Sequence, residues 1–414
     1  MPTDGRDGGV PDPATAGPAW VQIGTEGGVL PLPVVIPPTP VGYNYNRRDI
    51  VVTNVQEHAL FLGPAERADV IVDLSQIPVG SSLLLYNDSP APVPGYDVRL
   101  DYYTGAPDLS STGGAPLIQA GYGPNIRTVM QINITAGSTA SYMTAATGLA
   151  ALQAALPGVF QQTQPTIIIP QTSYPAAALH ASGGLPAKDT YARIQNTSGL
   201  TYTPINPTGF DPAITTPLQP KAIHELFEVD YGKMNSILAA EIPVTNYNNQ
   251  TTLPLAYVDP PTEIVHPDET QLWKVTHNGV DSHAMHFHLF DVQLINRVGW
   301  DGAIRPPDPN ELGWKETVRM NPLEDAIVAL RPIKPPLPFA IPESNRLFDP
   351  TRAPGATNTV SQPGFSNNDP NTGNPVTTVN ATYDYSWEYV WHCHLLGHEE
   401  SDMMRPIEIG RAHV

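Results

Sequence analysis

Residues 392–404 read HCHLLGHEESDMM and contain the only cysteine of the chain, Cys393, directly between two histidines. A second cluster, HAMHFH, occupies residues 283–288. Together the two clusters hold six of the twelve histidines. Random spacing would not place a lone cysteine between two histidines with a further histidine and methionines close behind. These two stretches therefore predict a metal centre, and their spacing predicts β-strands that build it.

Strand alternation divides the clustered side chains between two sites. Successive side chains of a strand point to opposite faces, so Cys393 is expected to point away from its two histidine neighbours. The same rule places His286 and His288 on one face and allows His283 to face away from them. One expected site has the ligands His283, Cys393 and His398. The other has the ligands His286, His288, His392 and His394.

The two sets of side chains favour different chemistry. The first set has Met403 five residues beyond His398, and two imidazoles, a thiolate and a weak axial thioether are typical of a blue-copper electron-transfer site. The second set offers imidazoles alone, which suits copper that meets dioxygen. Cys393 is bonded to both His392 and His394, so one residue's backbone connects the two expected sites.

Other interpretations of the clusters fit less well. Zinc accepts these ligands, but adjacent residues diverge, which gives H-C-H poor geometry for a closed zinc site. A buried core thiol leaves the neighbouring histidines unexplained, and a cysteine–histidine nucleophile would not need five further histidines. A metal-free domain would leave seven ligands without a role. The unclustered histidines are interpreted as hydrogen-bonded polar residues: His58, His180, His224, His266, His277 and His413.

Composition limits the fold class. The 414 residues include 47 Pro, which argues against a mainly helical chain because proline breaks helix interiors. Runs rich in Val and Ile between Pro, Gly, Asn and Asp predict an all-β protein of sandwich or barrel type. Such runs include Asp49–Val55, Ala68–Leu74, Ser82–Tyr86, Thr128–Ile134, Thr166–Ile169, Gln271–Thr276, Asp291–Val298, Ala326–Arg331 and Tyr385–Trp391. Gly137–Ala155 is the best helix candidate.

Charge and hydropathy limit the partners. The net charge of −19 argues against nucleic acid, whose backbone requires Lys and Arg. No apolar run approaches ~18 residues, so no membrane segment is expected, and residues 1–20 lack the apolar core of a signal peptide. One cysteine excludes an intrachain disulfide framework.

Three regions are expected along the chain. Residues 1–135 and 221–414 each predict a β-domain, and residues 136–220 form a connector or insertion rich in Pro, Ala and Thr. A second long insertion, residues 332–378, has little periodicity and is rich in Pro and Asn.

The histidine clusters resemble the copper motifs of multicopper oxidases, H-x-x-H-x-H followed by H-C-H-x-x-x-H-x-x-x-x-M. Residues 392–406 look like the bacterial and spore-coat laccase type, and also like phenoxazinone synthase. QIGTEGG at residues 22–28 and GPAERADVIVD at residues 63–73 resemble the middle cupredoxin domain of this family. The resemblance implies Greek-key β-sandwich cupredoxin domains with long loop insertions: a middle domain without copper, and a C-terminal domain with type 1 copper and half of the trinuclear ligands.

The resemblance assigns a role to each clustered residue. It implies that His283, Cys393 and His398 hold type 1 copper, with Met403 as the axial ligand. It implies that His286 binds type 2 copper and that the type 3 ligands are His288, His392 and His394. These four side chains are expected to face outward as an exposed pole of the domain. Glu399 matches an acid that moves protons toward reduced dioxygen, or else it is a hydrogen-bonding neighbour of the ligands. Trp391 is expected in the core, with electron transfer as the alternative, and Met404 is expected to pack.

Half of the family's trinuclear ligands are not found. The family uses eight imidazoles, four of them from two H-x-H pairs in an N-terminal domain, and the unclustered histidines form no such pair. We expect an N-terminally truncated form of a longer enzyme, or a split enzyme whose partner chain supplies four further histidines. The chain alone is then expected to assemble type 1 copper, without a stable type 2 and type 3 cluster.

The resemblance favours one-electron oxidation of phenols or aromatic amines, coupled to four-electron reduction of O₂ to water when the cluster is complete. A small-molecule electron donor and O₂ are the expected partners, and an extracytoplasmic or secreted location is implied. One alternative is a type 1 copper electron-transfer module. Another is a Mn(II) or Fe(II) oxidase, because the acidic residues Glu399, Glu400 and Asp402 could attract cations, although such a cluster can be a solvated face. Cuprous ion is disfavoured, since residues 136–220 contain only Met143.

Overall fold

The chain divides into two compact units. Unit 1 comprises Met1–Gly24, Leu32–Leu62 and Ala68–Val159, and unit 2 comprises Thr25–Pro31, Gly63–Arg67 and Phe160–Val414. A computed structural model describes residues 15–40, 42–43, 55–88, 108, 110–112, 117, 128–137, 145–164, 167, 199–202, 205–206, 209–210, 212–228, 233–241, 252–257, 259, 262–266, 269–277, 279, 281–299, 304–333, 338–339, 343–347, 350, 352–358, 377–384 and 387–409.

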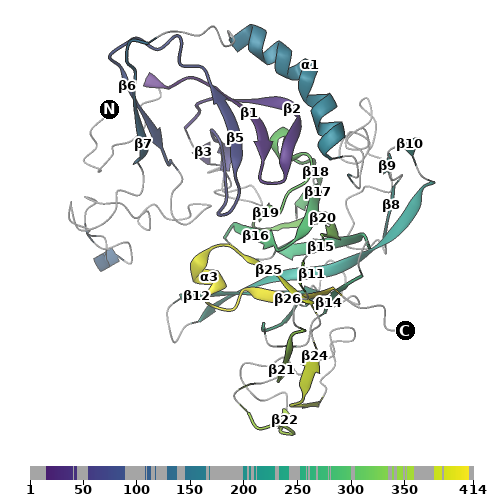
Figure 1. Ribbon diagram of the computed structural model, residues 1–414. Helices are drawn as coiled ribbons and strands as arrows, with labels where there is room; N and C mark the ends of the chain where they lie inside the picture. Colours follow the sequence, from purple (N-terminus) through teal and green to yellow (C-terminus); the bar gives the residue numbers. More distant parts are fainter. Residues whose placement is uncertain are drawn as a thin grey trace. The chain divides into compact units, whose positions relative to one another are not determined.

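The described part of unit 1 contains several short strands (Figure 1). They make one three-stranded sheet, with the order β2-β1-β5, and the antiparallel pairs β3–β4 and β6–β7. Gly28 has a φ of 128° at the start of β2, a conformation that favours glycine. The bounds are β1 Trp20–Thr25, β2 Gly28–Ile36, β3 Gly42–Tyr43, β4 Val55–Glu57, β5 Ala68–Val72, β6 Ser82–Tyr86 and β7 Thr128–Asn133, with a 3₁₀ turn at Ser110–Thr112.

The long helix α1 spans Ala145–Thr163, so the predicted bounds Gly137–Ala155 were wrong at the C-terminal end. Residues 138–144 of that prediction lie outside the described residues. The helix continues past Pro157, and tertiary contacts hold its last turn. Phe160 is buried in an apolar cluster, and the amide of Gln164 donates to the Val29 carbonyl at 2.9 Å. These distant contacts were not visible in local composition.

Unit 2 contains two large sheets. One has the order β13-β12-β11-β15-β20-β17-β18, with β8 also pairing with β11, and the other has the order β14-β26-β25-β16-β19. The strands of the first sheet are β8 Gly199–Tyr202, β11 Ile214–Glu228, β12 Lys233–Glu241, β13 Thr252–Pro254, β15 Gln271–His277, β17 Phe290–Gly299, β18 Ile304–Arg305 and β20 Glu324–Pro332. Those of the second are β14 Glu263–Val265, β16 His283–Phe287, β19 Thr317–Met320, β25 Trp387–Cys393 and β26 Met404–Ile409.

Smaller elements complete unit 2. The pairs β9–β10, β21–β24 and β22–β23 are two-stranded, and the last two pairs fall on the predicted insertion at residues 332–378 and just beyond it. Their bounds, with a 3₁₀ turn and a short helix, are β9 Ile205–Asn206, β10 Gly209–Phe210, η8 Pro309–Glu311, β21 Asn345–Leu347, β22 Thr357–Asn358, β23 Thr378–Val379, β24 Thr382–Asp384 and α3 Leu396–Glu399.

One apolar core lies between the two large sheets. Ile223, Trp273 and Val328 come from the first sheet, Phe287 and Trp391 come from the second, and all belong to one buried cluster. The chain crosses repeatedly from one sheet to the other between β15 and β25, as in a Greek-key sandwich. Every residue of β15 is buried, which is typical of a strand covered on both faces.

Buried ion pairs tie the segments 25–31 and 63–67 to β19 and its approach. Lys315 Nζ lies 2.9 Å from Glu26 and 3.2 Å from Glu66, and Arg319 Nε lies 2.8 Å from Glu66. Position 27 has room only for glycine, because a Cβ there would overlap the carbonyl of Trp314. The glutamates of QIGTEGG and GPAER therefore position the strand that flanks β16.

The predicted all-β class is confirmed, and seven of the nine predicted strand runs correspond to β5, β6, β7, β15, β17, β20 and β25. The other two, Asp49–Val55 and Thr166–Ile169, lie almost wholly outside the described residues. The predicted domain bounds 1–135, 136–220 and 221–414 stay a prediction. Among the described residues, no helix is both long enough and apolar enough to span a membrane.

Candidate metal centre

Pairing between β16 and β25 brings the two histidine clusters together. The strands are antiparallel, with Met285 opposite Cys393 and His286 opposite His392. Residues opposite each other in a sheet point to the same face, so Met285 and Cys393 face the core. His286 and His392 face the other way, which is the division that alternation predicted.

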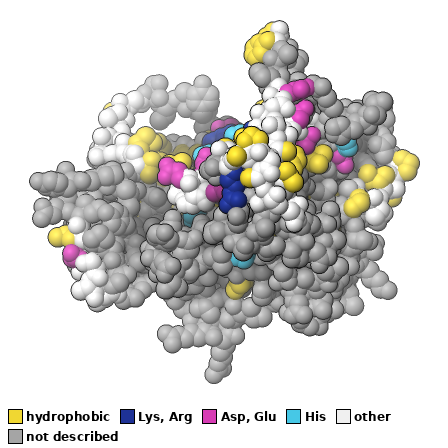
Figure 2. All heavy atoms as spheres, turned by 90° about the horizontal axis from the view of Figure 1, so that it is seen from below, with side chains coloured by type: hydrophobic (Ala, Val, Ile, Leu, Met, Phe, Trp, Pro, Cys, Tyr) yellow, Lys and Arg dark blue, Asp and Glu magenta, His cyan; other side chains and the backbone are white. Residues whose placement is uncertain are grey.

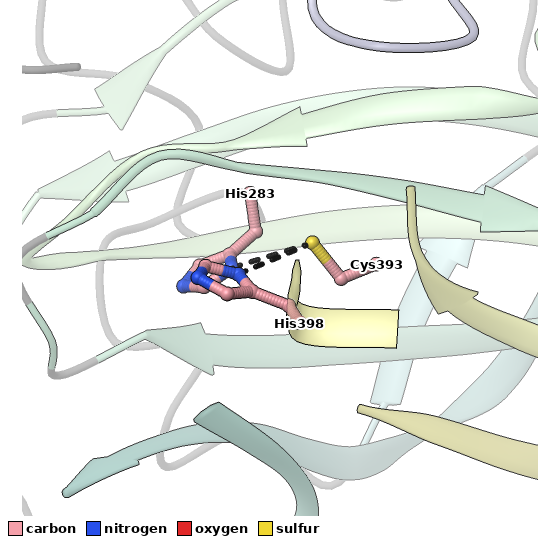
Figure 3. A group of neighbouring side chains, drawn as sticks. All are labelled: His283, Cys393 and His398. Carbon is pink, nitrogen blue, oxygen red and sulfur yellow. Dashed lines mark hydrogen bonds between the residues drawn. The ribbon is translucent and has the colours of Figure 1, made fainter. Parts of the chain in front are cut away.

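The thiolate group consists of His283, Cys393 and His398 (Figure 3). Cys393 Sγ lies 3.5 Å from His283 Nδ1 and 3.7 Å from His398 Nδ1, and the two Nδ1 atoms are 3.1 Å apart. His283 and Cys393 are buried, and His398 is half-buried in the short helix α3.

These distances fit a metal ion. A metal about 2.0 Å from imidazole nitrogens and about 2.3 Å from a thiolate holds its ligand atoms roughly 3 to 4 Å apart. The three donor atoms already converge at that separation. Two imidazoles with one thiolate suit copper in a trigonal site, so the donor set fits the group that the sequence predicted.

Electrostatics favour the thiolate form of Cys393. Burial alone would raise the pKa of the thiol, but hydrogen bonds with His283 and His398 outweigh it and lower the pKa to about 7. Burial alone would lower the pKa of His283, whereas hydrogen bonds with Cys393 and Glu225 raise it to about 9. A deprotonated thiol is the metal-binding form of cysteine.

Met403 lies beside this group in the buried core cluster. Its N–H donates to the His398 carbonyl at 3.0 Å, and its own carbonyl accepts from the Cys393 N–H at 3.0 Å. Asp402, with a φ of 76°, makes the turn before it, and its carboxylate accepts from the Tyr257 N–H at 3.2 Å. The axial role of Met403 stays a prediction, as do the roles of the other candidate ligands.

A second group contains imidazoles only and is formed by His286, His288, His392 and His394. Centroids of neighbouring rings lie 4.9 to 5.5 Å apart, and the Nε2 atoms of His288 and His392 are 3.1 Å apart. His288 is exposed, but His392 is only 3% exposed. The expectation that all four rings form an exposed surface was therefore wrong for His392.

Backbone and side-chain contacts orient two of these rings. His286 Nδ1 lies 3.0 Å from the Glu316 carbonyl and 2.9 Å from Thr317 Oγ1. Its N–H therefore donates at Nδ1 and leaves the Nε2 lone pair for a metal. His392 Nδ1 likewise donates to the Cys393 carbonyl at 3.0 Å. Burial, with the nearby charge of His288, lowers the pKa of His286 to about 4.

Glu399 lies on the short helix α3, beside the imidazole group. Its Oε2 is 3.4 Å from His392 Nδ1, and its side chain is 31% exposed. The carboxylate thus has access both to solvent and to a ring of this group. Its predicted function in proton movement stays a prediction.

The sequence prediction missed two residues behind His283. Glu225 Oε1 on β11 lies 2.6 Å from His283 Nε2, and His277 Nε2 lies 3.5 Å from the same oxygen. Burial, with the nearby charge of His283, lowers the pKa of His277 to about 4. One feature of the sequence could have indicated Glu225: strand alternation in β11 places it on the same face as the core residue Ile223.

The other singled-out residues have structural contacts. Trp391 is fully buried and stacks on Phe287 with ring centroids 5.8 Å apart, as expected for core. His224 Nδ1 lies 2.6 Å from Thr252 Oγ1, and His58 Nδ1 lies 2.6 Å from the Ala59 carbonyl. Outside the described residues lie His180 and His413.

Known proteins match part of the chain. Over 185 residues, 41% of this chain, it is 25% identical to a laccase of Bacillus subtilis (strain 168), of which the match covers 25%. Over 178 residues, 36% of this chain, it is 26% identical to multicopper oxidase LPR1 homolog 3 of Oryza sativa subsp. japonica, of which the match covers 26%. Over these matched parts, the chain is similar to laccases and other multicopper oxidases. No family model matches it.

Solved multicopper oxidases match the chain at low similarity. A laccase from Pediococcus acidilactici matches 95% of this chain and 45% of its own, with 17% identity and a TM-score of 0.40. The match to McoA of Aquifex aeolicus covers 94% of this chain and 50% of the McoA chain, with 15% identity and a TM-score of 0.41. The chain thus spans about half the length of these solved multicopper oxidases and about a quarter of the curated relatives.

Proposed function

We propose that this chain is the type 1 copper-bearing part of a copper-dependent oxidoreductase. It would take single electrons from phenols or aromatic amines and contribute half of the centre that reduces O₂ to water. The observation that carries the proposal is the position of Cys393. Its Sγ belongs to the thiolate group, and its peptide bonds join it to two members of the imidazole group, His392 and His394.

The donor atoms support copper as the metal of both groups. We assign His283, Cys393 and His398, with Met403 as the axial ligand, to type 1 copper. The imidazole group supplies half of the type 2 and type 3 ligands: His286, His288, His392 and His394. Bound copper supplies one-electron redox chemistry, which no side chain of the chain offers by itself.

Each remaining residue of the centre has a task that its position supports. Trp391 and Phe287 cover the buried side of Cys393 and exclude water from the thiolate. The half-buried His398 presents the accessible edge of the thiolate group, whereas Nε2 of His283 is occupied by Glu225. Glu399 would hold a proton at Oε2, 3.4 Å from His392 Nδ1, and renew it from solvent.

Four further imidazoles would complete the O₂-reducing centre. Outside the two clusters, the 414 residues contain no H-x-H pair. We propose that a segment of a longer polypeptide, or a partner chain, supplies these histidines. Two in-frame H-x-H motifs in the coding sequence directly upstream would support the first source, and the same motifs in a neighbouring gene would support the second.

Phenols and aromatic amines are favoured over Mn(II) and Fe(II) as electron donors. A metal-ion donor would need carboxylates free to bind it, but the Asp402 carboxylate already accepts the Tyr257 N–H. Among the described residues, acidic side chains lie at several separate places on the face shown in Figure 2. The experiment compares kcat/KM for a methoxyphenol and for Mn(II) in the completed enzyme. A higher value for Mn(II) would contradict the phenolic assignment.

A second function, that of a copper electron-transfer module, is favoured by one observation. Among the described residues, the thiolate group has its three strong ligands in place, whereas the imidazole group offers only half of the family's set. Such a module would exchange electrons with reductants and show no O₂ uptake even when the further histidines are supplied. Neither function requires nucleic acid or a membrane. We propose an extracytoplasmic or secreted location, which cell fractionation would test.

A further inference from the structure

Glu225 is a buried carboxylate that reaches the thiolate group from the opposite sheet. It lies on β11 in the first large sheet, whereas His283 lies on β16 in the second. The side chain of Glu225 is only 2% exposed, and its Oε1 lies 2.6 Å from His283 Nε2. A carboxylate withdrawn from water requires strong hydrogen bonds, and His283 provides one at 2.6 Å.

This contact determines which nitrogen of His283 carries the proton. A carboxylate only accepts hydrogen bonds, so Nε2 of His283 carries a proton, and Nδ1 is the nitrogen whose lone pair a metal would use. Nδ1 is the atom that lies 3.5 Å from Cys393 Sγ and 3.1 Å from His398 Nδ1. Glu225 therefore directs the donor atom of His283 toward the place where the three ligand atoms converge.

The loop between β15 and β16 holds the carboxylate in turn. The Asp281 N–H donates to Glu225 Oε1 at 3.3 Å. The Gly279 N–H donates to His277 Nδ1 at 3.1 Å, so the proton of His277 is on Nε2, where it donates to the Asp281 carbonyl at 2.5 Å. The same Nε2 lies 3.5 Å from Glu225 Oε1.

Gly279 leaves the space that the carboxylate fills. A Cβ at this position would overlap the carboxyl group of Glu225. The φ of Gly279 lies outside the left-handed region, so the backbone conformation itself does not demand glycine. The requirement is therefore one of space, and it is independent of the hydrogen bonds that Glu225 makes.

We propose that Glu225 is a positioning residue that sets the Cu(II) affinity and the reduction potential of the type 1 site through His283. The inference rests on the proposed copper function. A carboxylate that accepts the second N–H of a ligating imidazole fixes its orientation and raises its basicity. A more basic imidazole with a nearby negative charge favours Cu(II) over Cu(I), so Glu225 lowers the reduction potential.

The test uses the full chain loaded with copper and the variant Glu225→Gln, which keeps the size of the side chain and removes its charge. We expect Cu(II) affinity to fall by about 10–100-fold, Cu(I) affinity to change less, and the reduction potential to rise. Gly279→Ala displaces the carboxylate without altering a ligand, so its potential should shift in the same direction. If Glu225→Gln does not fold, the reduction potential of Gly279→Ala decides the test.

The matched control is Glu388→Gln. Glu388 also accepts hydrogen bonds, from Tyr257 and Ser344, but belongs to neither donor group. Its substitution should leave the potential and the thiolate-to-copper absorption band unchanged. A wild-type potential and Cu(II) affinity in Glu225→Gln, with the blue band present, would overturn this inference and leave the proposed function standing. Absence of the band in the wild-type chain would overturn both.

Discussion

Met285 and Cys393 lie directly opposite each other in the antiparallel pair of β16 and β25, and both side chains are fully buried. The next pair along, His286 and His392, therefore faces away from the core. A slip of one residue would exchange the faces of every side chain on the strand. This register thus separates the thiolate group from the imidazole group.

The separation predicts different effects for two histidines three residues apart. His283→Ala should abolish the blue absorption of the copper-loaded chain, because it removes a ligand of the thiolate group. His286→Ala should retain that absorption, since His286 belongs to the imidazole group. Visible spectra of the two variants at equal copper loading make the comparison. Loss of the blue band in both would show that the groups are not independent.

Trp391 should contribute strongly to stability. It is fully buried against Phe287 and Trp273, so Trp391→Ala should lower the free energy of unfolding by about 3–5 kcal/mol. Trp391→Phe should cost much less, because Nε1 is buried and has no hydrogen-bond partner among the described residues. Urea titration followed by circular dichroism measures both. Equal costs for the two variants would contradict this packing argument.

The buried ion pairs near β19 predict that removing one buried charge strongly lowers the free energy of unfolding. Glu311 accepts from both Arg297 and Arg319 and is 1% exposed, so Glu311→Gln leaves two buried guanidinium groups poorly compensated. We expect a loss of about 3–5 kcal/mol in the free energy of unfolding. The control is Glu316→Gln, whose partially exposed pair with Arg67 should contribute about 1 kcal/mol or less. Similar losses of stability in Glu311→Gln and Glu316→Gln would contradict the large contribution expected of the buried charge.

The metal-free chain should lose stability in mild acid through His277. Its folded pKa of about 4 lies below the ordinary value of 6.5. Between these values the unfolded chain binds more protons, so the free energy of unfolding falls as the pH falls from 6.5 to 4, by about 3 kcal/mol from this group. His277→Gln cannot titrate. Its stability should therefore approach that of the wild type over this pH range, and a pH-independent difference would contradict the prediction.

Strand alternation allowed the donor sets to be predicted, because parity is a local property of HAMHFH and of H-C-H. It could not predict Glu225, which lies 58 residues before His283 and meets it only because two sheets pack together. The burial of His392 and the end of helix α1 at Thr163 also depend on tertiary contacts. Local sequence determines which face a side chain takes, and packing determines what it meets there.

The most direct test of the central claim is a copper titration of the full 414-residue chain, followed by visible absorption and oxygen uptake. The account predicts about one tightly bound copper per chain with an intense thiolate-to-copper band, loss of that band in Cys393→Ser, and little O₂ uptake by the chain alone. Copper binding without such a band in the wild-type chain would contradict the type 1 site. A complete set of coppers with steady O₂ uptake would contradict the need for further histidines.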